Sequence, residues 1–458
     1  MLPDAEGPSD GEPIRTASVW RGSAAAFAGS VSGVVLGLAT SLLVARGLGP
    51  SGKGSYDLGI ATAGLLALAI GLSLPAGIAF AVAQRKSNPA KLARLLVALA
   101  GVQAAIAAVV LAVGMAVASG FFGSFPGLAT AALVVIVSAS TLSAGLRGIL
   151  VGVESIGRAA MLDLLTRVLI LAGIALVLIA SALGAGSATY VGLLWATALA
   201  GLIACLFAWV ALRHVRHGPA GPSGARVILA FSLPAHLGNL VQYLNYRLDL
   251  FLISLFATIA SVGIYALAVS FAQMVWLAPN AIAVALLPRV AEESSRGSGD
   301  TDVARVTRVT FVLSILAAIL LAVAGPPVIT VLFGRDFSPA GSQLILLLPG
   351  VTLFGPATVL AAYIGGRGRQ RLNLNISIVA LAVTVLFDLW LIPPLAGYGA
   401  AIASTLSYAT TAMLTFFVAT RLGTLRLRDM FIPRRGDLAT ARAVLDILRG
   451  SAGGHRRR

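Results

Sequence analysis

The chain has little charge, a single cysteine and few histidines, and each scarcity excludes a class of protein. Only 11% of its 458 residues are charged while 58% are hydrophobic, which is more apolar surface than a soluble fold of this length can bury. The lone Cys205 excludes an intrachain disulfide and lies in an apolar run, so we expect a buried, unreactive thiol. The four histidines are scattered, and the sequence has no Gly-rich phosphate loop and no metal-binding cluster. A polytopic membrane protein without a bound cofactor is therefore indicated.

Long apolar runs make up most of the chain. Runs of about 20 apolar residues, the length that crosses a bilayer as a helix, follow one another with short breaks. We predict twelve transmembrane helices, near 22–45, 57–84, 93–118, 127–150, 160–181, 188–212, 233–256, 261–287, 308–332, 340–364, 373–393 and 398–419. Residues 1–20 are acidic and rich in Pro and Gly, which favours a disordered tail and not a secretory signal. The segment 225–232 is expected to lie along the membrane surface before Pro234 lets the seventh helix enter.

Basic residues gather in the loops that follow even-numbered helices. Those loops hold sixteen arginines and lysines, whereas the odd-numbered loops hold only Arg46, Lys53 and Arg335. Positive residues collect on the cytoplasmic side, so we predict a multi-pass protein of a bacterial cytoplasmic membrane with both termini in the cytoplasm. The net charge of +16 is then an orientation signal and an attraction to anionic lipid headgroups, and no nucleic acid partner is expected. An amphipathic helix is expected on the inner leaflet within the basic tail 421–458.

A weak internal repeat divides the chain into two halves. Gly54-Ser-Tyr56 after the first helix matches Gly263-Ile-Tyr265 after the seventh, and Pro75 matches Pro279, each about half the chain apart. Halves of six helices share one orientation, so an axis along the membrane normal would relate them. We therefore predict an all-α fold of two six-helix lobes around a central cavity, with kinks at the two prolines and the two tyrosines at the membrane interface. The domains are the tail 1–20, the N-lobe 21–212, a cytoplasmic linker and interfacial segment 213–232, the C-lobe 233–420 and the basic tail 421–458.

The seventh helix, 233–256, has one apolar side and one polar side. Ionisable residues inside a membrane helix are costly and usually line a pathway or a cavity, and here Arg247 and Asp249 are two positions apart and point in different directions. Four further polar residues on this helix can bind sugar hydroxyls or join helix to helix, two alternatives that remain open. They are Asn239, Gln242, Tyr243 and Asn245.

Several short blocks together resemble the polysaccharide and oligosaccharide-lipid flippase branch of the multidrug/oligosaccharidyl-lipid/polysaccharide exporter superfamily. The blocks are Leu48-Gly49-Pro50, Tyr246-Arg247-Leu-Asp249, Val262-Gly263-Ile-Tyr265, Leu287-Pro288-Arg289, Leu332-Phe333-Gly334, Leu391-Ile392-Pro393 and Gly397-Tyr-Gly399. They span nearly the whole membrane region. The resemblance implies two lobes that open alternately inward and outward, and a lipid-pyrophosphate-linked glycan as cargo. A polysaccharide polymerase is a further candidate partner.

Five charged residues fall toward the outer halves of their helices and are expected to share one chamber. Arg247, helped by Arg46, is a candidate receiver of the pyrophosphate, because a guanidinium forks two hydrogen bonds to phosphate oxygens. The alternative is a structural ion pair of Arg247 with Asp388 or Asp57. Asp249, like those two acids, either carries structural charge or couples transport to Na+ or H+.

Two more charges are expected to form a structural pair within one helix. Asp163 and Arg167 are four residues apart with the acid first, the favourable order for such a pair.

The function predicted from these observations is the flipping of a polyprenyl-pyrophosphate-linked oligosaccharide from the cytoplasmic to the outer leaflet, with no bond made or broken. A cation-coupled multidrug exporter of the same superfamily is the alternative. A membrane glycan polymerase or ligase is a third class, and it is disfavoured because the outer loops are too short to form a catalytic domain.

Overall fold

In a computed structural model the chain is an all-α bundle. The structure describes residues 13–84, 89–117, 125–213, 225–283, 300–423 and 425–432. The helices are α1 (Pro13–Gly71), α2 (Leu74–Ala83), α3 (Pro89–Val117), α5 (Gly127–Gly152), α6 (Ile156–Ala182), α7 (Tyr190–Arg213), α8 (Ala225–Phe256), α9 (Ile259–Ala272), η1 (Gln273–Trp276), α11 (Asp300–Phe333), η2 (Arg335–Phe337), α12 (Ser338–Gly366), α13 (Gln370–Leu395), α14 (Gly397–Leu422) and α15 (Leu427–Phe431). The amphipathic helix expected within the C-terminal tail lies beyond the described residues.

Eleven helices in the described ranges are long and apolar enough to cross a membrane, against twelve predicted. The difference lies at the start, where the first two predicted helices are joined in α1. Gly49 has φ 66° and ψ −173°, which is not helical, and is followed by Pro50, so α1 consists of two helices that meet at a kink. The helix also begins at Pro13, inside the segment that the sequence predicted to be a disordered tail.

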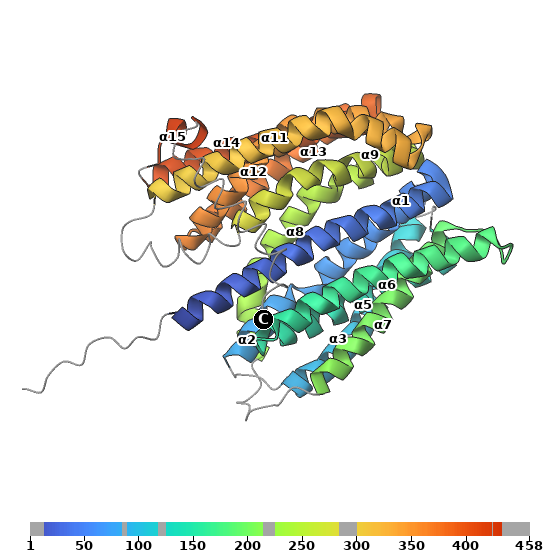
Figure 1. Cartoon of the computed structure of the whole chain (residues 1–458). Helices are drawn as coiled ribbons and strands as arrows, with labels where there is room; N and C mark the ends of the chain where they lie inside the picture. Colours follow the sequence, from blue (N-terminus) through green and yellow to red (C-terminus); the bar gives the residue numbers. More distant parts are fainter. Residues whose placement is uncertain are drawn as a thin grey trace, which may run out of the picture.

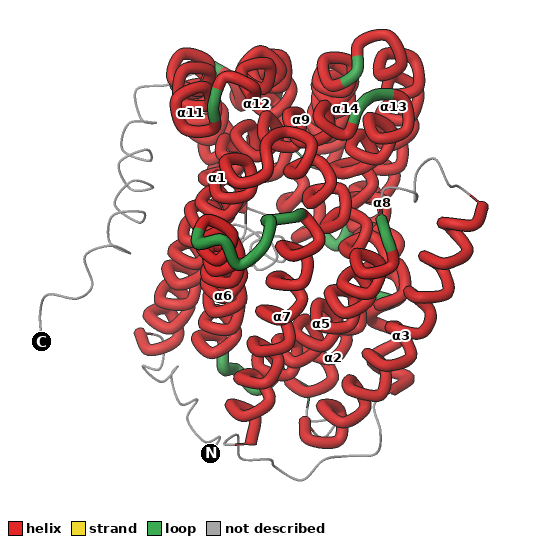
Figure 2. Tube along the Cα trace, turned by 90° about the vertical axis from the view of Figure 1, so that its right-hand side faces the viewer, coloured by secondary structure: helices red, strands yellow, loops and turns green. Residues whose placement is uncertain are grey.

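The helices form two groups that lie side by side (Figures 1 and 2). In one group α3, α5, α6 and α7 pack with α1 and α2, and in the other α11, α12, α13 and α14 pack with α9. Helix α8 contacts both groups, through α2 on one side and α13 on the other. The arrangement is consistent with the two halves predicted from the repeat, and it makes α8 the element that crosses the boundary between them.

Both helices that carry a repeat-related proline are interrupted, as predicted. Helix α2 starts directly after Leu72 and Ser73, which have φ values of 49° and 51°, and Pro75 lies in its first turn. The span Ile259–Ala283 contains the 3₁₀ turn η1 shortly before Pro279. A proline lacks the N–H that would bond to the preceding turn, so each interruption lies just before the proline.

The segment 225–232, expected to lie along the membrane surface, is continuous with the seventh predicted helix. These residues form the first turns of α8, which runs on through Pro234 as one helix. They pack against α2, where the rings of Phe80 and Phe231 stack with centroids 4.6 Å apart. A β-carbon on Gly77 would lie 2.4 Å from the carbonyl oxygen of Ile228, so the two backbones touch. This packing stabilises the segment as helix.

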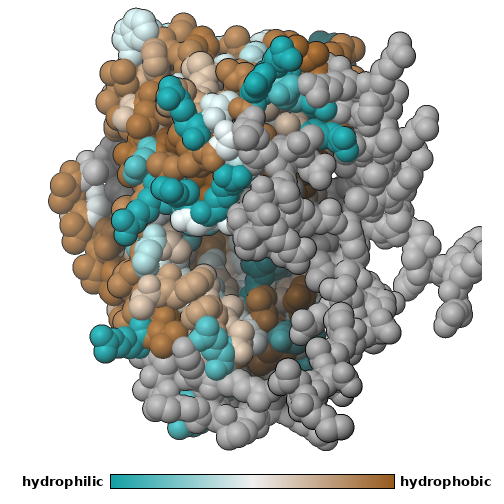
Figure 3. Space-filling model, turned by 90° about the vertical axis from the view of Figure 1, so that its left-hand side faces the viewer, coloured by the Kyte–Doolittle hydropathy of each residue, from teal (hydrophilic) through white to brown (hydrophobic). Residues whose placement is uncertain are grey.

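The sides and one end of the bundle differ in polarity. Large apolar side chains are exposed along the helices, such as Val109 and Val117 on α3, as expected where lipid surrounds a protein. Figure 3 looks onto the end that carries α15, where hydrophilic residues gather around the middle of the face and the surface is hollowed. Cys205 is buried, as predicted.

Candidate substrate site and buried carboxylates

The polar side of α8 is bonded to the first helix group over part of its length. The hydroxyl of Tyr243 donates to the carbonyl of Ala61 on α1 at 2.7 Å. The side-chain amide of Asn239 donates to Oγ of Ser73 at 3.0 Å, and Nδ1 of His236 lies 3.4 Å from the same oxygen. In this conformation Asn239 and Tyr243 therefore join helix to helix, one of the two alternatives that the sequence left open.

The other two amides of α8 lie in different surroundings. Asn245 donates from Nδ2 to the carbonyl of Ser377 on α13 at 3.0 Å. Gln242 is exposed and donates to the hydroxyl of Tyr246 at 2.5 Å. Gln242 is thus the amide of this set that remains open to a ligand, whereas Asn245 holds α8 to the second group.

Arg247 is half-buried in α8 and makes no hydrogen bond or ion pair with any residue that the structure describes. Its charge is felt by Asp249, Tyr243 and Tyr408, which are near enough for electrostatic interaction. An unpaired guanidinium inside a membrane helix is costly unless water or an anion reaches it. The position is therefore available to a negatively charged ligand.

Asp249 is 2% exposed, and its carboxyl oxygens are bonded to other groups of the protein. Its Oδ1 accepts from the backbone N–H of Leu250 at 2.8 Å. Its Oδ2 accepts from the hydroxyl of Tyr265 on α9 and from Ser404 on α14 at 3.3 Å. The carboxylate thus ties three helices of the second group together.

Asp388 on α13 is fully buried, and neither of its carboxyl oxygens has a hydrogen-bond partner in the described part of the chain. It lies near enough to Asp249 for the two carboxyls to interact electrostatically. Two buried carboxyls in mutual range cannot both stay ionised without a compensating proton or cation. The charge state of this buried pair is therefore linked to the uptake of a proton or a cation.

Tyr56 and Tyr265, which were expected at the membrane interface, lie inside the helix bundle. Both are buried. The hydroxyl of Tyr56 shares a hydrogen bond with Thr197 of α7 at 2.9 Å, and that of Tyr265 lies 2.9 Å from Ser404 of α14. Equivalent tyrosines thus meet equivalent hydroxyls on the last long helix of each group. Their repeated positions in the sequence were the signal that could have identified this role.

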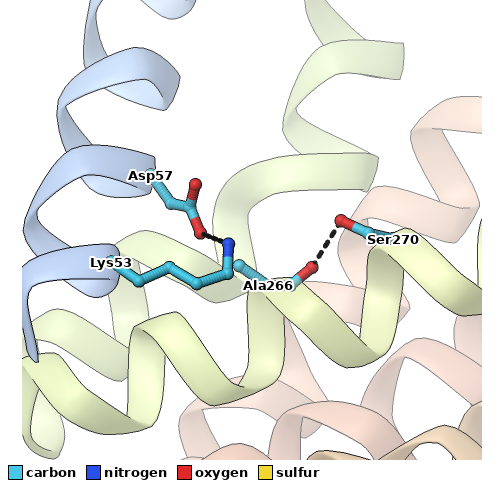
Figure 4. A network of polar contacts seen from close by, with 4 residues as sticks. All are labelled: Lys53, Asp57, Ala266 and Ser270. Carbon is cyan, nitrogen blue, oxygen red and sulfur yellow. Dashed lines mark hydrogen bonds and ion pairs between the residues drawn. The ribbon is translucent and has the colours of Figure 1, made fainter. Parts of the chain in front are cut away.

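Lys53, counted from the sequence as a loop residue, is buried between α1 and α9. Its Nζ lies 2.5 Å from Oδ2 of Asp57, with side-chain exposures of 2% and 20%. Figure 4 shows the pair on α1 facing α9, where Ser270 donates to the carbonyl of Ala266 at 2.8 Å. Asp57 therefore has a local partner of its own and does not pair with Arg247.

Arg46 is also engaged elsewhere. Its Nε donates to the carbonyl of Leu332 at 2.6 Å and its second nitrogen to that of Val331 at 2.7 Å. These carbonyls end α11, where a cation is favoured by the helix dipole. The five charges expected in one chamber are thus divided among three sets of contacts, and Arg46 and Arg247 do not form a joint phosphate site in this conformation.

The predicted pair within α6 is replaced by contacts between helices. Nε of Arg147 on α5 lies 3.0 Å from Oδ2 of Asp163. Arg167 instead donates to the carbonyl of Gly33 on α1 at 3.2 Å. The spacing of four residues permits a pair along one helix, but neighbouring helices offered each side chain a nearer partner.

An aromatic cluster in the second group was missed from the sequence. The rings of Tyr246, Trp276, Phe354 and Tyr408 come from α8, η1, α12 and α14, with centroids 4.9 to 6.5 Å apart. Nothing in the spacing of these four residues predicts that they meet. The cluster supports α8 directly beside Arg247.

The fold is that of a known class of membrane transporter. A structure of the lipid II flippase MurJ in an inward closed conformation aligns with a TM-score of 0.69 at 13% identity, over 93% of this chain and 97% of that one. An inward-facing multidrug resistance MATE family transporter of the MOP superfamily aligns with a TM-score of 0.63 at 19% identity, over 85% and 94%. At these identities the likeness concerns the fold.

The family follows from the sequence match. Residues 19–293 match the family described as "Polysaccharide biosynthesis protein", and the chain belongs to that family. A "Probable low-salt glycan biosynthesis flippase Agl15" of Haloferax volcanii is 24% identical over 276 residues, or 58% of this chain, and the match spans 56% of that relative. The superfamily resemblance drawn from the sequence is confirmed.

Proposed function

We propose that the protein flips a polyprenyl-pyrophosphate-linked oligosaccharide from the cytoplasmic to the outer leaflet by alternating access. Membership of the polysaccharide biosynthesis family and the name of the haloarchaeal relative, a glycan flippase, support this class of cargo. The observation that carries the proposal is Arg247, which lies within a membrane helix and has no hydrogen-bond or ion-pair partner in the described ranges.

Arg247 receives the pyrophosphate. A guanidinium binds phosphate oxygens through two parallel hydrogen bonds, which a lysine cannot reproduce. Neither of the two alternative partners is paired with Arg247. Asp57 is bonded to Lys53, and Asp388 makes no ion pair in the described residues. Arg247 lies nine residues before the end of α8, about 14 Å along the helix axis, so a headgroup bound there has travelled well into the membrane.

The polar residues of α8 bind the sugar part of the cargo. Gln242 is exposed on the same helix, five residues before Arg247, and its amide can bond to a sugar hydroxyl. Asn239 and Tyr243 hold the two helix groups together in this state and become free for sugar hydroxyls when the groups separate. Asn245, held by α13, positions the helix. The polyprenyl tail stays in lipid.

The conformation suits cargo loading from the cytoplasm. Helices α1 and α9 are in backbone contact near the Gly49 kink, the end predicted to face outward. The opposite end, predicted to be cytoplasmic along with both termini, carries the hollow in Figure 3. We place the protein in the cytoplasmic membrane, where the hollow would admit a headgroup made inside and hand it to a polymerase outside.

Asp249 and Asp388 couple this movement to an ion. A proton or Na+ that enters between them removes the cost of two buried carboxyls and strengthens the contact of α8 with α13. Asp388→Asn should make flipping insensitive to the ion gradient, measured in liposomes with an imposed Na+ or pH gradient. Unchanged gradient dependence in that variant would exclude the carboxyl pair as the coupling site.

The central experiment reconstitutes the protein with a fluorescent polyprenyl-pyrophosphate oligosaccharide and measures its translocation. Arg247→Ala should slow flipping about 10- to 100-fold, as expected for one charge-assisted forked contact, and Arg247→Lys should retain part of the rate. Arg421→Ala is the matched control, because that guanidinium lies on the ring of Phe417 at the end of α14. Equal rates for Arg247→Ala and wild type, or none above empty liposomes, would contradict the proposal. Cation efflux that survives Arg247→Ala and is lost in Asp249→Ala would favour a drug exporter.

A further inference from the structure

The break between α1 and α2 lies within the span predicted over 57–84 and interrupts the backbone hydrogen bonding of the helix. Leu72 and Ser73 adopt left-handed φ values that residues with side chains rarely accept. Such conformations persist where surrounding contacts require them and gather at functional sites. The carbonyl of Gly71, the last residue of α1, would bond in a continuous helix to the N–H of residue 75. That residue is Pro75, which has none.

Two side chains from other helices approach the same glycine. A β-carbon placed on Gly71 would lie 3.6 Å from Nε2 of Gln103 on α3 and 4.0 Å from Oγ1 of Thr141 on α5. Gln103 is 4% exposed and Thr141 is 7% exposed. The oxygens Oε1 of Gln103 and Oγ1 of Thr141 have no hydrogen-bond partner among the residues that the structure describes.

These polar groups lie between two separate apolar clusters of the first helix group. One cluster includes Leu133 and Val137 of α5, and the other includes Leu146 of the same helix and Leu96 of α3. Buried oxygen atoms without a partner are costly and uncommon in folded proteins. Two such oxygen atoms between apolar clusters indicate that a bound ion or water molecule lies beside them.

We propose that Gly71, Gln103 and Thr141 form a binding site for a monovalent cation, probed here as Na+. The carbonyl end of α1 carries the negative end of its helix dipole, and ends of broken membrane helices are favourable places for Na+. The oxygens are uncharged, whereas Ca2+ and Mg2+ take carboxylates, so the chemistry selects a monovalent ion. The site is separate from Asp249 and Asp388, which lie in the other helix group.

A cation at this point would act on the boundary between the groups. Ser73, two residues beyond Gly71, receives the amide of Asn239 and lies beside His236 of α8. Fixing the break with an ion fixes the position of Ser73 and therefore the first half of α8. The proposal rests on the helix break and on the unpartnered oxygens beside it. It does not depend on which cargo is flipped.

The test measures Na+ binding by the purified full-length protein in lipid nanodiscs. Radioactive Na+ gives the affinity, and thermal unfolding is compared in NaCl and choline chloride at equal ionic strength. Introduced into the Asp388→Asn variant, Gln103→Leu and Gly71→Ala should each weaken Na+ affinity at least tenfold and remove the Na+-dependent rise in Tm. The alanine β-carbon would meet its neighbours at ordinary van der Waals distance, so this variant should fold.

Two controls separate the site from the general loss of a buried polar group. Thr141→Val should behave like Gln103→Leu. Thr62→Val should keep the wild-type affinity, because the buried hydroxyl of Thr62 already donates to the carbonyl of Leu58 at 2.8 Å. Asp388→Asn should leave this Na+ site intact.

Three results would overturn the inference. They are absence of Na+ binding by the wild type, unchanged affinity in both Gln103→Leu and Gly71→Ala, and loss of all binding in Asp388→Asn alone. In the second case a buried water lies beside the two oxygens. Failure to flip a lipid-linked glycan would refute the proposed function and leave this result standing.

Discussion

Gly54 of α1 and Gly263 of α9 lie backbone against backbone. A β-carbon on Gly54 would fall 3.0 Å from the nitrogen of Gly263, and one on Gly263 would fall 2.7 Å from the nitrogen of Gly54. The two glycines are equivalent in the internal repeat. Residues that contact their own equivalents lie on the axis that relates two halves, as in an isologous dimer. Such a contact is what the predicted pseudo-two-fold relation would produce, and it lies at the closed end of the bundle.

Substituting either glycine should open that end. A β-carbon on Gly54 would also lie 1.9 Å from the carbonyl oxygen of Ile259, and such overpacking costs about 1–3 kcal/mol. Gly54→Ala should thus raise the rate at which a polar maleimide labels a cysteine introduced at Ser270, in the seam shown in Figure 4. Gly37→Ala, with open space around its β-carbon, is the control and should label like the parent. Equal labelling of both variants would show that the contact does not gate this end.

Breaking the buried pair of Lys53 and Asp57 should be more costly than removing it. Asp57→Asn leaves a lysine that is 2% exposed without its counter-charge, and an uncompensated buried charge costs about 3–5 kcal/mol. The double variant Lys53→Met with Asp57→Leu should recover most of that loss. Thermal unfolding of the single and double variants measures the coupling. A double variant less stable than Asp57→Asn would contradict the argument.

The two repeat-related tyrosines should differ in what their hydroxyls contribute. Tyr265→Phe deprives the buried carboxylate of Asp249 of a donor, and hydrogen bonds to charged groups contribute about 1.5–3 kcal/mol. Tyr56→Phe removes a bond between two neutral hydroxyls, for which about 0.5–1.5 kcal/mol is expected. Chemical denaturation of both variants compares them directly. An equal loss would mean that Asp249 is neutral in the folded protein.

The pair of Arg147 and Asp163 should matter little for stability. Their side chains are 55% and 45% exposed, and exposed ion pairs contribute about 0–1 kcal/mol. Asp163→Asn should therefore lower Tm by no more than a few degrees, and added salt should shrink the difference further. A loss as large as that of Asp57→Asn would show that the pair is shielded from solvent by lipid.

Hydropathy and proline placement predicted much of the fold because they act along one helix at a time. The membrane class, the positions of the spans and the interruptions near Pro75 and Pro279 were all readable in this way. The span count differs by one because the two helices that meet at Gly49 form a single element, α1. The start of α8 differed because its packing on α2 outweighs the helix-breaking tendency of Pro234. At the start of α8 a tertiary contact therefore overrides a local preference.

The polar side of α8 was readable from the sequence alone, and so was the repeat that predicts two equivalent halves, because helical periodicity and a repeat need no knowledge of neighbours. Only the tertiary structure decided which charge meets which. In the structure Asp57 pairs with Lys53 and Asp163 with Arg147, Asp249 accepts a hydrogen bond from Tyr265, and Arg46 donates to the end of α11. Arg247 has no bonded partner in the described residues. The physical reason is that Coulomb and hydrogen-bond energies depend on distances of a few ångströms between helices. Those distances are set by how whole helices pack.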